Sequence, residues 1–222
     1  MIYNIAIDGP AGAGKSTIAR RVARELSFIY VDTGAMYRAM ALYLLRRKVN
    51  RDDTEQIGNI CQDAEISIEY KNGEQIVLLN GENVNSYLRT EEVGNMASVS
   101  SAVPRVREKL LSLQRKLAKD MSVVMDGRDI GTTILPDADV KIYLTASSLT
   151  RAKRRYLELQ EKGTVCNLDD IQKDIEERDQ RDMSREISPL RQAEDAVLVD
   201  TSELNFDQSF EALKKVIQDR AK

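Results

Sequence analysis

Near its start the chain reads Ile5-Ala6-Ile7-Asp8 and then Gly9-Pro10-Ala11-Gly12-Ala13-Gly14-Lys15-Ser16-Thr17. The second part fits the pattern G-x-x-x-x-G-K-[ST], a glycine-rich loop whose backbone N–H groups surround phosphates. The pattern needs a strand before it and a helix after it. An apolar run precedes Gly9, and apolar residues recur at helical spacing after Lys15. The sequence therefore predicts a phosphate-binding loop between a strand and a helix, with a chance glycine-rich turn as the alternative.

The motif also predicts roles within the loop. Lys15 is expected to reach the β- and γ-phosphates of ATP, and the Ser16 hydroxyl is expected to bind Mg²⁺. The glycines let backbone amides approach the phosphates without side chains in the way. We therefore expect every residue from Gly9 to Thr17 to belong to the ATP site.

The composition restricts the possible chemistry. The 222 residues contain no histidine, which excludes imidazole catalysis and metal sites built on histidine. Cys61 and Cys166 lie far apart in no metal-like spacing, so we expect free thiols in the reducing cytoplasm. The net charge of −3 argues against general nucleic-acid binding, and no apolar run is long enough to predict a membrane span. We expect a cytoplasmic monomer that binds neither nucleic acid nor membrane.

Short apolar segments alternate with helical patterns along the chain. Buried parallel strands are predicted at residues 4–8, 28–32, 122–126, 140–144 and 196–200. This alternation predicts an α/β fold. Typical helix starts occur at Thr90, Pro104 and Asn167.

The alternation breaks at residues 65–85. Asn72-Gly73 and Asn80-Gly81 are hairpin signals between segments with strand-like patterns. They predict a small antiparallel sheet inserted into the parallel fold. A solvent-facing meander without a ligand role is the alternative for this region.

The first three predicted strands end in aspartate, at Asp8, Asp32 and Asp126, and open α/β sheets bind ligands at the carboxyl ends of their strands. Asp32, with Tyr37 and Arg38 on the next helix, is expected to form a wall of an acceptor site. Asp126 lies where P-loop proteins often keep a carboxylate that supports Mg²⁺. An ordinary role at a helix start is the alternative for Asp32, and a turn role is the alternative for Asp126.

A P-loop enzyme must also neutralise a second phosphorylated substrate. The candidate cations near strand ends or helix starts are Arg38, Arg107, Arg128 and Arg185. Residues 178, 182 and 185 are spaced so that one helix would project Arg178, Asp182 and Arg185 from one face. A salt-bridged surface helix is the alternative.

A basic helix start follows the fourth predicted strand. Arg151, Lys153, Arg154 and Arg155 lie between that strand and Gly163, as they would in a mobile lid. Arginines that arrive on lid closure can stabilise the transferring phosphoryl group. A solvated basic surface is the alternative.

With these residues in view, the chain closely resembles the bacterial cytidylate kinases, within the nucleoside monophosphate kinase family. The most specific motifs are the middle ones, Asp126-Gly127-Arg128-Asp129-Ile130-Gly131-Thr132 and the segment inserted at residues 65–85. The similarity extends over almost the whole chain and includes Ile7-Asp8-Gly9-Pro10, Asp32-Thr33-Gly34-Ala35-Met36-Tyr37-Arg38, Pro104-Arg105-Val106-Arg107-Glu108, Leu159-Gln160-Glu161-Lys162-Gly163 and Glu177-Arg178-Asp179-Gln180-Arg181-Asp182.

The resemblance implies a transferase of pyrimidine nucleotide metabolism that moves the ATP γ-phosphate to CMP or dCMP with Mg²⁺. It implies a five-stranded parallel core at residues 1–60 and 101–222, a lid near 148–166 and an inserted CMP-binding domain at 61–100.

The resemblance also assigns residues to substrates. Ser98, Arg107 and Asp129 would read cytosine. The CMP phosphate would be held by Arg38, Arg128 and Arg185, and Arg178 with Asp182 would face the ribose. The implied CMP site also includes Asp32, Thr33, Tyr37, Asp126 and Gly127. The implied catalytic residues are Lys15, Arg128, Arg151, Arg154, Arg155 and Arg185.

Two positions depart from many relatives. Ala11 stands where many have serine, so position 11 offers the acceptor phosphate no hydroxyl, whereas Thr33 keeps one where some have serine. Two rival functions remain open, a kinase for another nucleoside monophosphate and a P-loop switch that binds GTP. The absence of an Asn-Lys-x-Asp segment, which would read guanine, counts against the switch.

Overall fold

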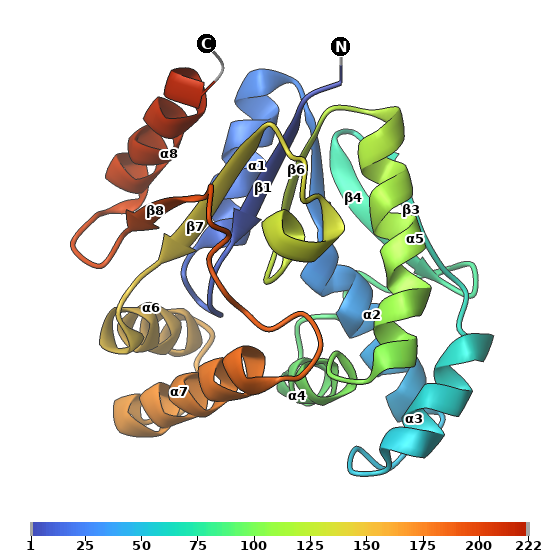
Figure 1. Cartoon of the computed structure of the whole chain (residues 1–222). Coiled ribbons are helices and arrows are strands. Elements are labelled where there is room, and N and C mark those ends of the chain that lie inside the picture. Colours follow the sequence, from blue (N-terminus) through green and yellow to red (C-terminus); the bar gives the residue numbers. More distant parts are fainter. Residues whose placement is uncertain (1, 221–222) are drawn as a thin grey trace.

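A five-stranded parallel sheet forms the centre of the computed structural model, which describes residues 2–220 (Figure 1). Its strand order is β2-β6-β1-β7-β8, and every neighbouring pair is parallel. The strands are β1 (Asn4–Asp8), β2 (Ile29–Asp32), β6 (Val123–Gly127), β7 (Val140–Thr145) and β8 (Val197–Asp200). The five predicted strands and the α/β class are confirmed.

Helices cover both faces of this sheet because the strands alternate their side chains between two apolar cores. Ile5 and Ile7 of β1 pack with α1 (Lys15–Leu26) and α8 (Phe206–Arg220), whereas Ala6 packs on the other side with α2 (Thr33–Arg46) and α5 (Pro104–Asp120). All three β1 side chains are fully buried. Buried faces on both sides explain why the parallel strands read as continuous apolar runs.

The predicted antiparallel sheet is also confirmed. It consists of β3 (Ile66–Lys71), β4 (Glu74–Leu79) and β5 (Glu82–Asn83). Its turns have positive φ at both residues of each pair, 54° and 77° at Asn72 and Gly73, and 50° and 82° at Asn80 and Gly81. Such angles are those of type I′ hairpins, which is why Asn-Gly pairs occupy both turns.

The small sheet rests on the core. The Asp32 backbone N–H donates to Gln75 Oε1 at 2.9 Å, and Gln75 Nε2 donates to the Asp32 carbonyl at 3.2 Å. The sheet is therefore fixed to the strand end from which α2 begins. Its role towards a ligand and the domain boundary at residues 61–100 stay predictions.

Most of the other helices follow the capping signals. Thr90 caps α4 (Glu91–Ser100), Asn167 caps α7 (Leu168–Ser184), and Pro104 opens α5. The helix of the predicted lid, α6 (Ser148–Glu161), begins after a Ser147 cap. The sequence did not predict α3 (Thr54–Ile60), the 3₁₀ turn Cys61–Asp63 or the π-helical turn η2 (Ile130–Ile134).

One helix boundary was wrong. Arg185 was expected on the same helix face as Arg178 and Asp182, but α7 ends at Ser184 and Arg185 has an extended backbone with ψ of 140°. Pro189, four residues after Arg185, has no N–H to donate to the Arg185 carbonyl, so a helix that continued through this segment would lose that hydrogen bond. Among residues 2–220, no helix is long and apolar enough to span a membrane.

Candidate active site

The loop between β1 and α1 takes a backbone shape that only glycine allows easily. Gly9, Gly12 and Gly14 have φ of 148°, 74° and 87°. A Cβ atom at Gly9 would lie 1.9 Å from the Leu144 carbonyl oxygen. Gly14 is the N-cap of α1, so the loop ends at the positive end of a helix dipole. The backbone of the loop therefore has the shape that the phosphate-binding motif predicts.

Lys15 is buried inside this loop. Its side chain is only 5% exposed, and its Nζ donates to the Pro10 carbonyl at 2.8 Å. Burial, together with the charge of Arg128, lowers the pKa of the Lys15 ammonium well below its usual value, although Asp126 and Asp8 oppose the shift. Phosphates beside Lys15 would favour the charged form, so anion binding would offset the cost of burying it.

Ser16 and Asp126 form a candidate binding site for a divalent cation. Ser16 Oγ donates to Asp126 Oδ2 at 3.1 Å, and the Tyr30 hydroxyl donates to Oδ1 at 2.8 Å. Burial and the neighbouring Asp32 carboxylate raise the pKa of Asp126 to about 6. Two crowded carboxylates beside a hydroxyl are a donor set that fits Mg²⁺.

The protein alone offers this cation few ligands. Residues 2–220 hold no cluster of three or more Asp, Glu, His or Cys side chains that could bind a metal. Mg²⁺ usually binds through one or two carboxylates and completes its shell with water and substrate phosphates. The small number of protein ligands at Ser16 and Asp126 therefore suits a cation that binds together with a nucleotide.

At the end of β6, Asp129 lies between two arginines. It forms a buried ion pair with Arg107, and its Oδ1 lies 3.6 Å from Arg185 Nη2. Burial raises the pKa of the Asp129 carboxyl, and Arg107 and Arg185 oppose that shift. The structure thus brings two of the predicted cytosine readers, Arg107 and Asp129, into direct contact.

The predicted phosphate and ribose residues lie beside this pair. Arg128 Nε donates to Asp182 Oδ2 at 2.8 Å. Burial, with the charge of Arg128, lowers the pKa of Arg178 to about 10, and burial also lowers the pKa of Arg38 although Asp32 opposes it. Within residues 2–220, neither Arg178 nor Arg38 has an ion-pair partner. Arg178 and Arg38 are thus buried guanidinium groups without a directly paired carboxylate, a state that suits a bound anion.

A cleft of about 870 Å³ opens beside this cluster, between α3, the α4–α5 junction and the end of α7. Ser98, Asp182 and Arg185 line it. Ser98 Oγ is buried and has no hydrogen-bond partner among the described residues. The cleft has the size of a small-molecule site, and its unpaired hydroxyl is available to a ligand.

Three further residues predicted for the CMP site support its walls. The Thr33 hydroxyl donates to the Asp126 carbonyl at 2.8 Å, so Thr33 joins α2 to β6. The Tyr37 ring lies 5.6 Å from the Arg107 guanidinium. A Cβ atom at Gly127 would lie 2.8 Å from the Thr33 hydroxyl oxygen, so the close approach of these segments needs glycine there.

Only one arginine of the predicted lid touches the phosphate loop. Arg151 donates to the Ala11 carbonyl at 3.0 Å and pairs with Asp179 at 2.6 Å. Arg154 instead donates to the Thr201 carbonyl at 2.8 Å, and Arg155 forms an exposed pair with Glu158. The structure brings Arg151 to the loop and leaves Arg154 and Arg155 elsewhere. A closing motion of α6 stays a prediction.

The sequence did not indicate the role of Asp8. Asp8 is 4% exposed, and its two carboxylate oxygens accept the N–H groups of Ile130 and Gly131 at 2.8 and 2.7 Å. Burial raises its pKa to about 7 despite these two hydrogen bonds. Asp8 therefore ties the strand before the phosphate loop to the segment that follows Arg128 and Asp129. Its position directly before Gly9 was the only signal.

Comparisons with known proteins agree with this geometry. A family model described as "Cytidylate kinase" matches residues 5–219. A protein of Lactobacillus johnsonii named "Cytidylate kinase" is 48% identical over 221 residues, covering 100% of this chain and 96% of that protein. One of Caldicellulosiruptor saccharolyticus with the same name is 48% identical over 215 residues, covering 97% and 94%.

A solved structure resembles the fold alone. The crystal structure of an uncharacterized protein from Eubacterium ventriosum has a TM-score of 0.55 and 14% identity, covering 99% of each chain. That likeness concerns the arrangement of the sheet and helices and says nothing of the reaction.

Proposed function

Because the chain belongs to the cytidylate kinase family, we propose that it transfers the γ-phosphate of ATP to CMP or dCMP, giving ADP and CDP or dCDP. The observation that carries this proposal is a juxtaposition at one edge of the sheet. The loop with Lys15 and the cluster around Asp129 both lie at the carboxyl ends of β1 and β6. Open α/β sheets bind their ligands at this edge.

In this proposal Lys15 and the amides from Gly9 to Thr17 hold the ATP phosphates. Ser16 and Asp126 hold Mg²⁺, which neutralises developing charge on the phosphates when it is bound. Arg38, Arg128 and Arg185 hold the phosphate of CMP, and Arg178 with Asp182 faces its ribose. The protein contributes positioning and charge, which is nearly all that phosphoryl transfer requires of it.

Cytosine would be read by the buried pair of Arg107 and Asp129, with Ser98 beside them. The exocyclic amino group of cytosine is a donor suited to Asp129, and its ring nitrogen is an acceptor suited to Arg107. Uracil reverses both groups and would leave buried charges unpaired. We therefore expect CMP to exceed UMP by about 10²-fold or more in kcat/KM.

An acceptor panel tests the proposal. ADP formation from ATP is measured with CMP, dCMP, UMP, AMP and GMP, with Lys15→Met as the inactive control. We expect CMP and dCMP to be the best acceptors, no activity in excess chelator, and a monomer by sedimentation. A preference for another nucleotide would identify a different acceptor, and slow hydrolysis that ignores all five would indicate a switch.

A further inference from the structure

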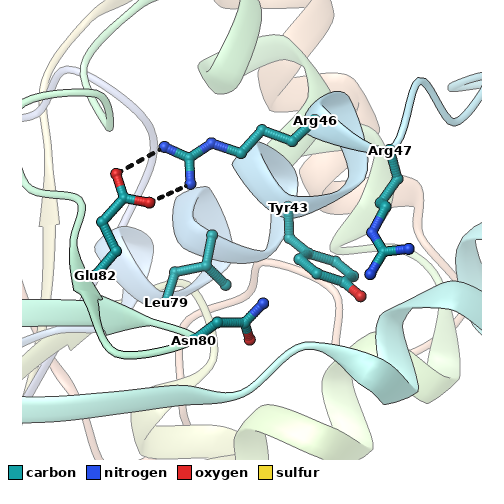
Figure 2. A pocket seen from close by; sticks show the side chains of 6 residues that line it. All are labelled: Tyr43, Arg46, Arg47, Leu79, Asn80 and Glu82. Atoms are coloured by element: carbon teal, nitrogen blue, oxygen red, sulfur yellow. Dashed lines mark hydrogen bonds and ion pairs between the residues drawn. The ribbon is translucent and has the colours of Figure 1, made fainter.

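A second, smaller pocket lies at the far end of α2 from the candidate active site. It has a volume of about 220 Å³ and opens between the C-terminal end of α2 and the turn from β4 to β5 (Figure 2). Its lining residues are Tyr43, Arg46, Arg47, Leu79, Asn80 and Glu82. None of them lines the larger cleft. The pocket is smaller than the usual site of a drug-sized ligand, which restricts it to a small ligand or one end of a larger one.

One wall of the pocket is an ion pair that is already complete. Arg46 Nη1 and Nη2 donate to the two Glu82 oxygens at 2.6 and 2.9 Å, and Figure 2 shows this double contact. The pair joins α2 to β5 and neutralises Glu82. It therefore leaves Arg47 as the uncompensated charge of the pocket.

Three donor groups of the pocket, of which only the Tyr43 hydroxyl is buried, have no side-chain or backbone acceptor within residues 2–220. Tyr43 is only 3% exposed, and its hydroxyl has no hydrogen-bond partner among the described residues. The Arg47 guanidinium lies 5.2 Å from the Tyr43 ring and forms no ion pair within residues 2–220. Asn80 Oδ1 accepts from the Glu65 N–H at 2.8 Å, which leaves its Nδ2 group free to donate.

These groups share one need, an acceptor with several oxygens. A buried hydroxyl without a partner costs free energy that a ligand oxygen would recover. Both side chains line the same pocket, and the Arg47 guanidinium lies 5.2 Å from the centre of the Tyr43 ring, so a small anion between them is within reach of both residues (Figure 2). The α2 C-terminus carries a partial negative charge, and the Arg47 guanidinium, which has no carboxylate partner among the described residues, offsets its repulsion of an anion.

We propose that this pocket binds a small oxyanion of the phosphate class, held by the Arg47 guanidinium, the Tyr43 hydroxyl and the Asn80 amide. The anion would bridge α2 and the β4–β5 turn. The opposite ends of α2 and β4 meet at Asp32, where Gln75 contacts its backbone. An oxyanion in this pocket therefore joins the far ends of two elements that meet at the acceptor side of the active site.

The test must separate this pocket from the phosphate loop, which also binds phosphate. Inorganic phosphate is titrated into isotope-labelled protein to about 10 mM, ten times a millimolar Kd, while backbone amide signals are followed. Ribose 5-phosphate is a second arm that distinguishes a phosphate monoester from the free ion. We expect saturable shifts at the amides of residues 45–48 and 79–81 as well as at residues 12–16.

Variants assign the shifts. Tyr43→Phe and Arg47→Gln should each weaken the response of residues 45–48 and 79–81 at least about tenfold, the effect of losing a hydrogen bond to a charged ligand, and leave residues 12–16 unchanged. Tyr87→Phe and Arg51→Gln are matched controls outside the pocket lining and should change neither response. Pocket amides that do not shift, or that shift equally in all four variants, would overturn the proposal.

Discussion

The candidate active site has two halves, the loop proposed to bind the ATP phosphates and the cluster proposed to bind the acceptor, and they use different chemical groups. The triphosphate half is mostly backbone, a loop whose shape depends on positive φ at Gly9, Gly12 and Gly14. The acceptor half consists of side chains, the buried pair Arg107–Asp129 and the partly buried pair Arg128–Asp182. The first half is contiguous in the sequence, whereas the second draws on α5, β6 and α7.

This difference separates general from specific recognition. Backbone amides and a helix end attract any phosphate, so we expect the loop to bind the triphosphate group that all nucleoside triphosphates share. Paired side chains present a fixed pattern of donors and acceptors, and they leave charges unpaired when the wrong base binds. Damage to the loop should therefore reduce the rate with every acceptor, whereas damage to the side-chain pairs should change the ranking of acceptors.

The largest effect is expected at Lys15. Lys15→Met removes the cation of the loop, and we expect kcat to fall by about 10³- to 10⁵-fold, the range that a cation on the transferring phosphoryl group contributes. The ratio of CMP to UMP activity should stay unchanged. Steady-state kinetics with both acceptors measures this, and circular dichroism checks the fold. Near-normal turnover in a folded variant would contradict the role of the loop.

The next effect concerns Asp8, which connects the two halves. Its pKa of about 7 in the folded protein is above that of an unfolded aspartate. Between pH of about 4 and 7 the folded protein binds more protons at this site, so the free energy of unfolding falls as pH rises, by up to about 4 kcal/mol. Above this window Asp8 adds no further change.

In the Asp8→Asn variant the free energy of unfolding should decrease less between pH of about 4 and 7, because asparagine has no proton to lose. Urea unfolding at several pH values measures it. The matched control is Asp139→Asn, which alters the acceptor of the Asn4 N–H near the other end of β1. Asparagine also offers one acceptor where Asp8 offers two, so we expect a weaker hold on Ile130 and Gly131 and a lower CMP to UMP ratio. Parallel pH profiles in the wild type and Asp8→Asn would contradict this assignment.

The acceptor half is tested at Asp129. Asp129→Ala should remove most of the preference for CMP over UMP, a change of about 10²-fold in the ratio of kcat/KM values. Asp179→Asn is the control, since it alters another buried carboxylate that pairs with an arginine, Arg151. If Asp129 serves only as a structural partner of Arg107, both acceptors will slow by the same factor. An unchanged ratio would thus reduce the pair to a structural role.

The contrast between the halves also explains how much the sequence could predict. The loop, the five strands and the Asn-Gly turns of the small sheet were predictable because the conformation of each depends on residues that are neighbours along the chain. Of the acceptor half, Arg107, Arg128 and Asp182 were named from their positions in the sequence and Asp129 through the family resemblance, but the pairing of these residues was not predicted. Arg107 and Asp129 lie in separate segments, and only tertiary packing shows that they contact each other.

One error and one omission have different causes. Helical spacing put Arg185 on α7, but the backbone becomes extended at Arg185 itself, four residues before Pro189. Asp8 looked like the last residue of a strand because its two partners, the amides of Ile130 and Gly131, lie more than a hundred residues away. The Asp8 contacts have no local signature, whereas Pro189 was a local signal for the end of α7.

The smallest effect on kcat is expected for substitutions in α6, where a side chain contacts the backbone of the loop. Arg151 is a side chain that reaches the backbone of the loop at Ala11, whereas Arg155 pairs with Glu158 on the surface. If α6 closes over the transferring phosphoryl group, Arg151→Ala should lower kcat by about tenfold and change CMP affinity little, because the contact matters mainly in the transition state. Arg155→Ala should have a smaller effect on kcat, since its side chain makes no contact with the loop.

Arg151→Lys keeps the charge but loses the planar fork that contacts Ala11 and Asp179 together, so it should recover only part of the rate. Single-turnover rates and CMP titrations measure the two quantities separately. Equal rates in all three variants would show that the loop acts alone, and a loss of CMP affinity without a loss of rate would assign Arg151 to the acceptor half.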